Sequence, residues 1–117
     1  RGVAHMGVGI GKGEDRISEA VREAIESPLL ETSIKGAKAI LMDIAGGYDL
    51  AMLELNEAAD QIAKDADKDA VIYFGTSIRE EMQDEVVIIV IATGFDHIFK
   101  LIFNFIAQGR KLSRISS

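Results

Sequence analysis

The stretch VAHMGVGIGKG (residues 3–13) decides the fold, because it alternates glycine with larger side chains. Gly7, Gly9, Gly11 and Gly13 all fall on one parity. Successive side chains of a strand point to opposite faces of its sheet, so a strand here has one face without side chains. The backbone of another element could approach that face closely. The stretch therefore predicts a first β-strand that ends near Gly13.

These glycines do not match a nucleotide-binding motif. Lys12 stands where a dinucleotide fingerprint beginning at Gly7 and Gly9 needs its third glycine. Gly13 follows the lysine where a phosphate-binding loop needs serine or threonine. The glycines also lie within the predicted strand rather than only after it. We therefore assign them a structural role.

Helical and extended patterns alternate along the chain after this strand. Two amphipathic helices are predicted, over residues 14–27 and about 52–67, with Pro28 ending the first. Three more strands are predicted, over residues 36–44, 70–78 and 85–93. The unbroken apolar run of residues 86–91 is typical of a strand that is central or buried on both faces.

The resulting order, β-α-β-α-β-β, predicts an α/β fold of the α+β sandwich kind. Its four-stranded mixed sheet has helices packed on it. The short third connection suggests that the last two strands run antiparallel. Right-handed crossovers place both helices on the same face of the sheet.

Composition and charge narrow the function classes. The 117 residues fit one domain, and 48% of them are apolar, which excludes a disordered chain. The absence of cysteine excludes disulfides, thiol catalysis and cysteine-bound zinc, and is compatible with a reducing cytoplasm. Residues 1–96 carry 9 basic and 19 acidic side chains, whereas residues 97–117 carry a charge of +4. The negative charge of residues 1–96 would repel phosphate backbones, which argues against nucleic-acid binding.

No segment has the length or flanks of a transmembrane helix or a secretory signal. The chain begins at Arg1 rather than at an initiator methionine, so we interpret it as a fragment or a processed chain.

Candidate catalytic and metal-binding residues are few. The two histidines, His5 and His97, are far apart and have no third ligand at a recognisable spacing, which makes a weak metal case. The hydroxyl residues have no evident base, which leaves nucleophilic catalysis without support; they are Ser27, Ser33, Thr76 and Ser77.

Two acidic features need a separate explanation. The run formed by Asp65, Asp67 and Asp69 lacks the glycine and the closing glutamate of a calcium loop, so a solvated helix end explains it better. Asp43 lies inside a predicted strand, where a charge is costly unless it faces solvent, a partner or a cleft. An exposed strand face is the simplest explanation.

Taken together, several blocks of sequence resemble FtsZ, the tubulin-like GTPase of bacterial division. AHMGVGIGKGEDR (residues 4–16) looks like the stretch that opens the second domain of FtsZ, and SPLLETSI (27–34) resembles the turn after its next helix. The remaining blocks follow in order: GA (36–37), LMDI (41–44), EAAD (57–60), FGT (74–76) and ATGFD (92–96). The chain is thus identified as similar to the C-terminal domain of FtsZ over residues 1–96, with residues 97–117 as a separate tail.

The resemblance implies a place in a polymer. FtsZ subunits assemble head to tail into protofilaments of the cytokinetic ring, in the cytoplasm at the division site. GTP sits on the N-terminal domain of one subunit, and the next subunit supplies acidic residues from a loop just before the point where this chain starts. We therefore expect this chain to be no enzyme and to hold no cofactor, with GTP bound only by the full-length parent. The implied partners are other FtsZ subunits and the chain's own N-terminal GTPase domain.

The resemblance also implies an interface and an apolar contact. It places the neighbouring subunit on the edge that includes the Gly46-Gly47 turn, with contacts from Tyr48, Asp49, Leu50, Met52 and Leu53. The alternative is that Leu50 and Leu53 are core residues. The bare glycine face is expected near the helix that links the two domains of the parent. Apolar surface that the parent covers would favour self-association of this chain.

The tail does not fit the family. HIFKLIFNFIA (97–107) is strongly apolar, and residues 109–117 are basic and serine-rich. Lys100, Asn104, Gln108 and Lys111 recur at helical spacing. Three interpretations remain open: sequence that is not native to the domain, a helix docked on this or a neighbouring domain, and a basic amphipathic helix on an anionic membrane.

Two rival functions come from other classes. A small oligomeric α/β domain with an inter-subunit small-molecule site would need a cluster of converging polar residues, and the sequence shows none. An interaction module anchored by the amphipathic tail is the second rival. Fold alone does not separate these classes.

Overall fold

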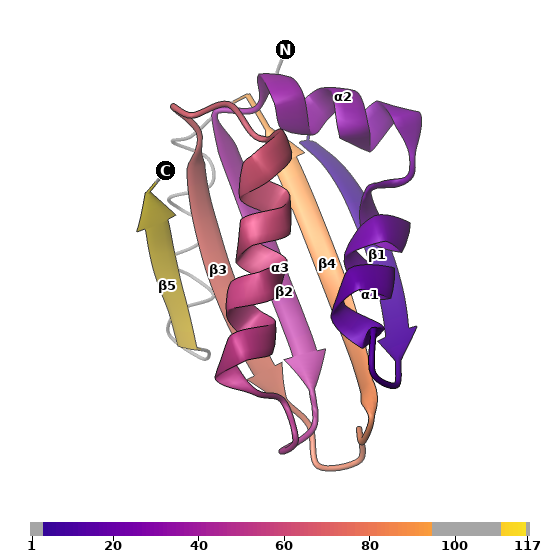
Figure 1. Cartoon of the computed structure of the whole chain (residues 1–117). Helices are drawn as coiled ribbons and strands as arrows, with labels where there is room; N and C mark the ends of the chain where they lie inside the picture. Colours follow the sequence, from indigo (N-terminus) through magenta and orange to yellow (C-terminus); the bar gives the residue numbers. More distant parts are fainter. Residues whose placement is uncertain (1–3, 95–110, 117) are drawn as a thin grey trace.

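The computed structural model describes residues 4–94 and 111–116. Its elements, in chain order, are β1 (Ala4–Lys12), α1 (Arg16–Ile25), α2 (Pro28–Gly36), β2 (Ala39–Gly46), α3 (Met52–Asp65), β3 (Val71–Ile78), β4 (Glu85–Thr93) and β5 (Lys111–Ser116). All four predicted strands and both predicted helices are present. Figure 1 shows α1 and α3 along one face of a twisted sheet, with α2 lying across the upper end of the same face.

The sheet is mixed, as predicted, with the strand order β1-β4-β2-β3-β5. Only β2 and β3 run parallel, while the other neighbouring pairs are antiparallel. The apolar run of β4 lies between β1 and β2, which confirms the prediction of a central strand. β3 and β4 run in opposite directions but are separated by β2.

The glycine face of β1 is covered by this domain's own helices. A Cβ at Gly7, Gly9 or Gly11 would overlap a backbone carbonyl oxygen of α1. The missing side chains thus allow α1 to lie directly on the strand backbone. The expectation that this face lies near a linking helix was therefore wrong, because α1 already occupies it.

A third helix, α2, occupies the segment interpreted as a turn. Pro28 stands at the start of α2, where its missing N–H costs no hydrogen bond. The same proline therefore separates α1 from α2 rather than leading into a loop. Leu30 and Ile34 of α2 are buried, and the helix extends to Gly36, so β2 begins only at Ala39.

The main core lies between the helices and the sheet. Alternate residues of β2, β3 and β4 point into it, together with the apolar stripes of the helices. Its largest fully buried side chains are Leu30, Ile34, Ile40, Met42, Ile44, Ile62, Ile72, Ile88, Val21, Val86 and Val90. Both predicted helices pack on the same face of the sheet, as expected.

The opposite face of the sheet, here called the second face, carries the other parity of each strand. Met6, Val8 and Ile10 of β1 lie on it and are exposed. Leu41 and Tyr73, from β2 and β3, are buried in a second, smaller apolar cluster. Apolar character on this face therefore extends to the exposed edge strand.

Part of the tail forms a fifth strand. Residues 111–116 make up β5, which pairs antiparallel with β3 from Val71↔Ser116 to Thr76↔Lys111. The helical pattern predicted for the tail therefore does not include Lys111. The apolar segment 97–107 lies outside the described residues, so its docking and its membrane contact stay predictions. Within residues 4–94 and 111–116, no helix combines the length and the apolar character needed to cross a bilayer.

Candidate subunit interface

Three loops meet at the end of the sheet where β1, β2 and β3 finish and β4 begins (Figure 1). The first loop (13–15) follows β1, the second (47–51) follows β2, and the third (79–84) joins β3 to β4. Gly13 donates its backbone N–H to the carbonyl of Asp84 at 3.0 Å, which joins the first loop to the third. Arg79 donates its N–H to the carbonyl of Gly46 at 2.8 Å, which joins the third loop to the second. A Cβ on Gly47 would overlap the carbonyl oxygen of Met82. The second and third loops are therefore in direct backbone contact.

Three large apolar side chains project from this end. Tyr48 is 79% exposed, Met52 is 70% exposed and Leu53 is 80% exposed. A hollow of about 440 Å³ lies beside Tyr48 and is lined by Tyr48, Asp49, Gln83 and Asp84. Such an arrangement can receive a protruding group from a partner and insert its own side chains in return.

The structure separates the two leucines of the predicted interface. Leu50 is half-buried and packs against the main core, so the core alternative is confirmed for it. The exposure of Leu53 excludes that alternative for Leu53. The interface role itself stays a prediction for all five residues.

Asp49 is exposed, and its carboxylate pairs with Arg16, the first residue of α1. The Arg16 Nη1 lies 3.0 Å from Asp49 Oδ2, and Nη2 donates to the Asp49 carbonyl at 3.2 Å. Arg16 also makes two bonds to Glu54, from Nε to Oε2 at 2.7 Å and from Nη2 to Oε1 at 2.8 Å. The guanidinium, which belongs to a residue only 4% exposed, is thus surrounded by four acceptor contacts.

The electrostatics follow from this pairing. The hydrogen bond from Arg16 holds the pKa of Glu54 below its usual value, with help from the N–H of Ala51. The backbone N–H of Asp84 lowers the pKa of Asp49 most, and Arg16 lowers it further. The pKa of Arg16 is raised, chiefly by its hydrogen bond to Glu54. All three groups are charged at neutral pH.

The sequence pattern did not single out Arg16. One signal was present, because the start of a helix carries partial positive charge and is an unfavourable place for a cation. A buried arginine there indicates carboxylate partners. Its partners lie 33 and 38 positions away, so only the fold reveals them.

The other candidate residues do not form a catalytic site. His5 Nδ1 lies 2.7 Å from Ser33 Oγ, a contact that joins β1 to α2 and that the sequence did not predict. Asp43 lies in β2 on the second face of the sheet and is half-buried. Asp67 Oδ1 accepts the N–H of Asp69 at 3.0 Å within the turn before β3. In the described part of the chain, no group of three or more acidic or histidine side chains could hold a metal ion.

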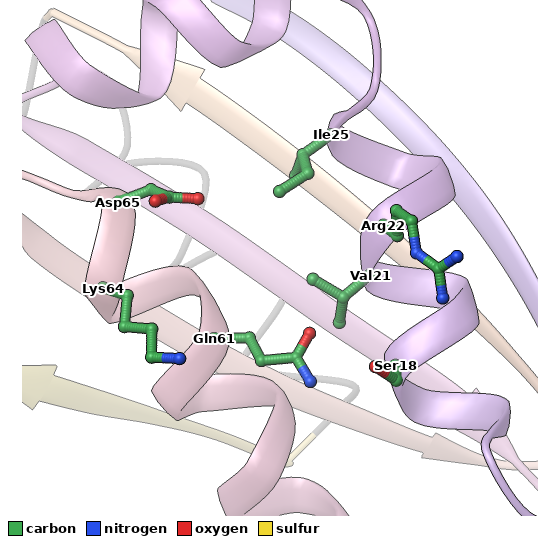
Figure 2. A pocket seen from close by; sticks show the side chains of 7 residues that line it. All are labelled: Ser18, Val21, Arg22, Ile25, Gln61, Lys64 and Asp65. Atoms are coloured by element: carbon green, nitrogen blue, oxygen red, sulfur yellow. The ribbon is translucent and has the colours of Figure 1, made fainter.

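A second groove runs between α1 and α3 (Figure 2). Its volume is about 370 Å³, and its lining consists of Ser18, Val21, Arg22, Ile25, Gln61, Lys64 and Asp65. Figure 2 shows Val21 and Ile25 on the α1 side, with Gln61 and Lys64 facing them from α3. The groove mixes apolar and charged side chains without a converging polar cluster.

The fold and this end of the sheet define a class of protein, the C-terminal α+β domain of tubulin-like proteins. The sequence model described as "FtsZ family, C-terminal domain" matches residues 2–96. The chain therefore belongs to the FtsZ family.

Solved structures agree with this assignment. An empty FtsZ dimer from M. jannaschii is 33% identical, with a TM-score of 0.73, and the match covers 82% of this chain and 28% of that one. The W319Y mutant of FtsZ from M. jannaschii is also 33% identical, again with a TM-score of 0.73 and 82% of this chain covered, and 29% of its own chain. CetZ1 from Haloferax volcanii, a GDP-bound monomer, has a TM-score of 0.64 at 20% identity over 92% of this chain and 35% of its own, which supports the fold alone. The chain thus spans less than a third of the FtsZ chains that it matches.

Proposed function

We propose that this domain supplies part of the head-to-tail contact between FtsZ subunits. The observation that carries the proposal is the group formed by Tyr48, Met52 and Leu53, which are exposed together at one end of the sheet. Large apolar side chains that are exposed together are characteristic of the centre of a protein interface. The relative from M. jannaschii is described as a dimer, which supports self-association in this family.

The partner in this proposal is the N-terminal GTPase domain of a neighbouring FtsZ subunit. The protofilament would belong to the cytokinetic ring, in the cytoplasm at the division site. We further propose that this chain neither binds nor hydrolyses GTP by itself. The glycines of β1, which are its strongest superficial match to a phosphate loop, pack against α1 instead.

Interference with FtsZ assembly tests the proposal. The purified chain is added in increasing amounts to FtsZ from M. jannaschii, and polymer formed with GTP is measured by sedimentation. We expect the chain to occupy the exposed end of growing protofilaments, so that the polymer yield falls as its concentration rises. The chain alone should release no phosphate from GTP.

Two lysine substitutions make the test specific. Leu53→Lys should abolish the interference, because it places a charge in the proposed contact. Leu29→Lys is the matched control, since Leu29 is also an exposed leucine but lies on α2. Equal interference by Leu53→Lys and the unchanged chain would contradict the proposal, as would no effect of the unchanged chain at large excess.

A further inference from the structure

Arg16 is a buried charge in an unfavourable place. It is the first residue of α1, where the helix dipole repels a cation, and burial adds a desolvation cost. A guanidinium stays charged even when it is buried, so its burial is tolerated only where its donors are paired. The hydrogen bonds to Asp49 and Glu54 meet that need.

Both partners of Arg16 belong to the segment that presents the exposed side chains. Asp49 lies in the loop after β2, and Glu54 lies in the first turn of α3. Glu54 accepts two parallel N–H bonds, a geometry that fixes direction as well as distance. Arg16 therefore binds the segment 47–54 at two points, at Asp49 in the loop and at Glu54 in the first turn of α3.

Each residue that Arg16 binds follows directly after one of the exposed apolar residues. Asp49 follows Tyr48, and Glu54 follows Met52 and Leu53. Asp49 and Glu54 are directed toward Arg16, while the residue before each of them, Tyr48 or Leu53, is exposed to solvent. Asp49 Oδ2 also accepts the N–H of Asp84 at 3.0 Å, which ties the third loop to the same carboxylate.

We infer that Arg16 is a positioning residue for the proposed contact with a neighbouring FtsZ subunit. It holds the segment 47–54 in the conformation in which Tyr48, Met52 and Leu53 together meet a neighbouring subunit. The inference rests on the proposed function for its partner, while the ordering of the segment can be tested without one. A surface that is already ordered loses less conformational entropy on binding.

Amide hydrogen exchange tests the ordering. Arg16→Met keeps the length of the side chain but removes its charge and donors. We expect amide exchange within residues 48–54 to become at least about tenfold faster, because the loop opens locally more often. The amides of β4 serve as an internal reference for intact folding. Arg22→Met is the matched control, since Arg22 is an exposed arginine of the same helix and the substitution should leave residues 48–54 unchanged.

A conservative variant and a titration separate pairing from packing. Arg16→Lys should give an intermediate exchange rate, because an ammonium cannot form two parallel bonds to a carboxylate. In Arg16→Met, the pKa of Glu54 should rise, since the hydrogen bond from Arg16 is the largest cause of its lowering. If Arg16→Met does not fold, Glu54→Gln removes the same ion pair from the other side and should produce the same exchange pattern.

The functional consequence is measured in the FtsZ sedimentation assay. Arg16→Met should need about tenfold more chain than the unchanged protein for the same loss of polymer, and Arg22→Met should need the same amount. Unchanged exchange in residues 48–54 would overturn the inference, and so would faster exchange with full interference. If the unchanged chain itself does not interfere, the proposed function fails, and hydrogen exchange alone still decides whether Arg16 orders the segment.

Discussion

At the scale of single residues, the glycines of β1 show what periodicity can and cannot predict. Their shared parity predicted a strand with one bare face, and the structure confirms it. Parity did not reveal that α1 would be the element packed there, because that depends on how the chain turns at Gly13. The pairing of Arg16 was equally hidden, since its partners are distant in sequence.

Adding one methyl group to β1 tests the close packing. Gly9→Ala places a Cβ against the carbonyl oxygen of Ala20 and about 2.7 Å from the backbone nitrogen of Ala24. The backbone of α1 has to move away, and we expect the free energy of unfolding to fall by about 3 kcal/mol or more. The measurement is urea denaturation followed by circular dichroism.

Gly36→Ala is the matched control for that substitution. Gly36 ends α2, and a Cβ there meets nothing within 4 Å. Alanine should be neutral or raise the free energy of unfolding by about 0.5 kcal/mol, because it reduces the freedom of the unfolded chain. Equal effects of the two substitutions would show that α1 does not rest on the backbone of β1.

At the scale of elements, α2 and β5 were not predicted from the sequence, and the reason differs between them. α2 was hidden by Pro28, which can end one helix and also begin the next. The buried apolar residues of α2, Leu30 and Ile34, span only about one helical turn. So short a pattern does not distinguish a helix from a loop. β5 carries lysine, arginine and serine, which are tolerated on an edge strand and give no alternating apolar signal. Its place is defined by pairing with β3 rather than by its own pattern.

Adjacent leucines of α2 test whether this helix is part of the core. Leu30→Ala should lower the free energy of unfolding by about 2–5 kcal/mol, since Leu30 is fully buried. Leu29→Ala should change it by about 0.5 kcal/mol at most, because Leu29 is exposed. Thermal and urea denaturation of both variants provide the comparison. Similar losses at the two positions would mean that α2 does not pack as described.

At the scale of the whole molecule, the helices cover one face of the sheet and leave apolar residues on the other. Met6, Val8 and Ile10 form an exposed row along β1 on the second face. Contiguous apolar surface of this kind mediates association when nothing covers it. The expected self-association therefore has a second candidate surface, distinct from the group of Tyr48, Met52 and Leu53.

Sedimentation velocity with single lysine substitutions separates the two surfaces. We expect the chain to sediment faster as its concentration rises, and Val8→Lys to reduce that increase by placing a charge in the middle of the β1 row. Met52→Lys changes the other surface and should retain the increase. A larger effect of Met52→Lys than of Val8→Lys would assign self-association to the loop end instead.

The register of the outer strands has a practical consequence for protein engineering. Ala4 and Thr93 are partners across β1 and β4, so their Cα atoms lie about 5 Å apart. Residues 4–93 thus leave and return to nearly the same point in space. A gene segment encoding them could be inserted into a surface loop of a host protein without separating the ends of that loop. Inserted in this way, the domain would present its loop end, with Tyr48 and Leu53, on the side opposite the two insertion points.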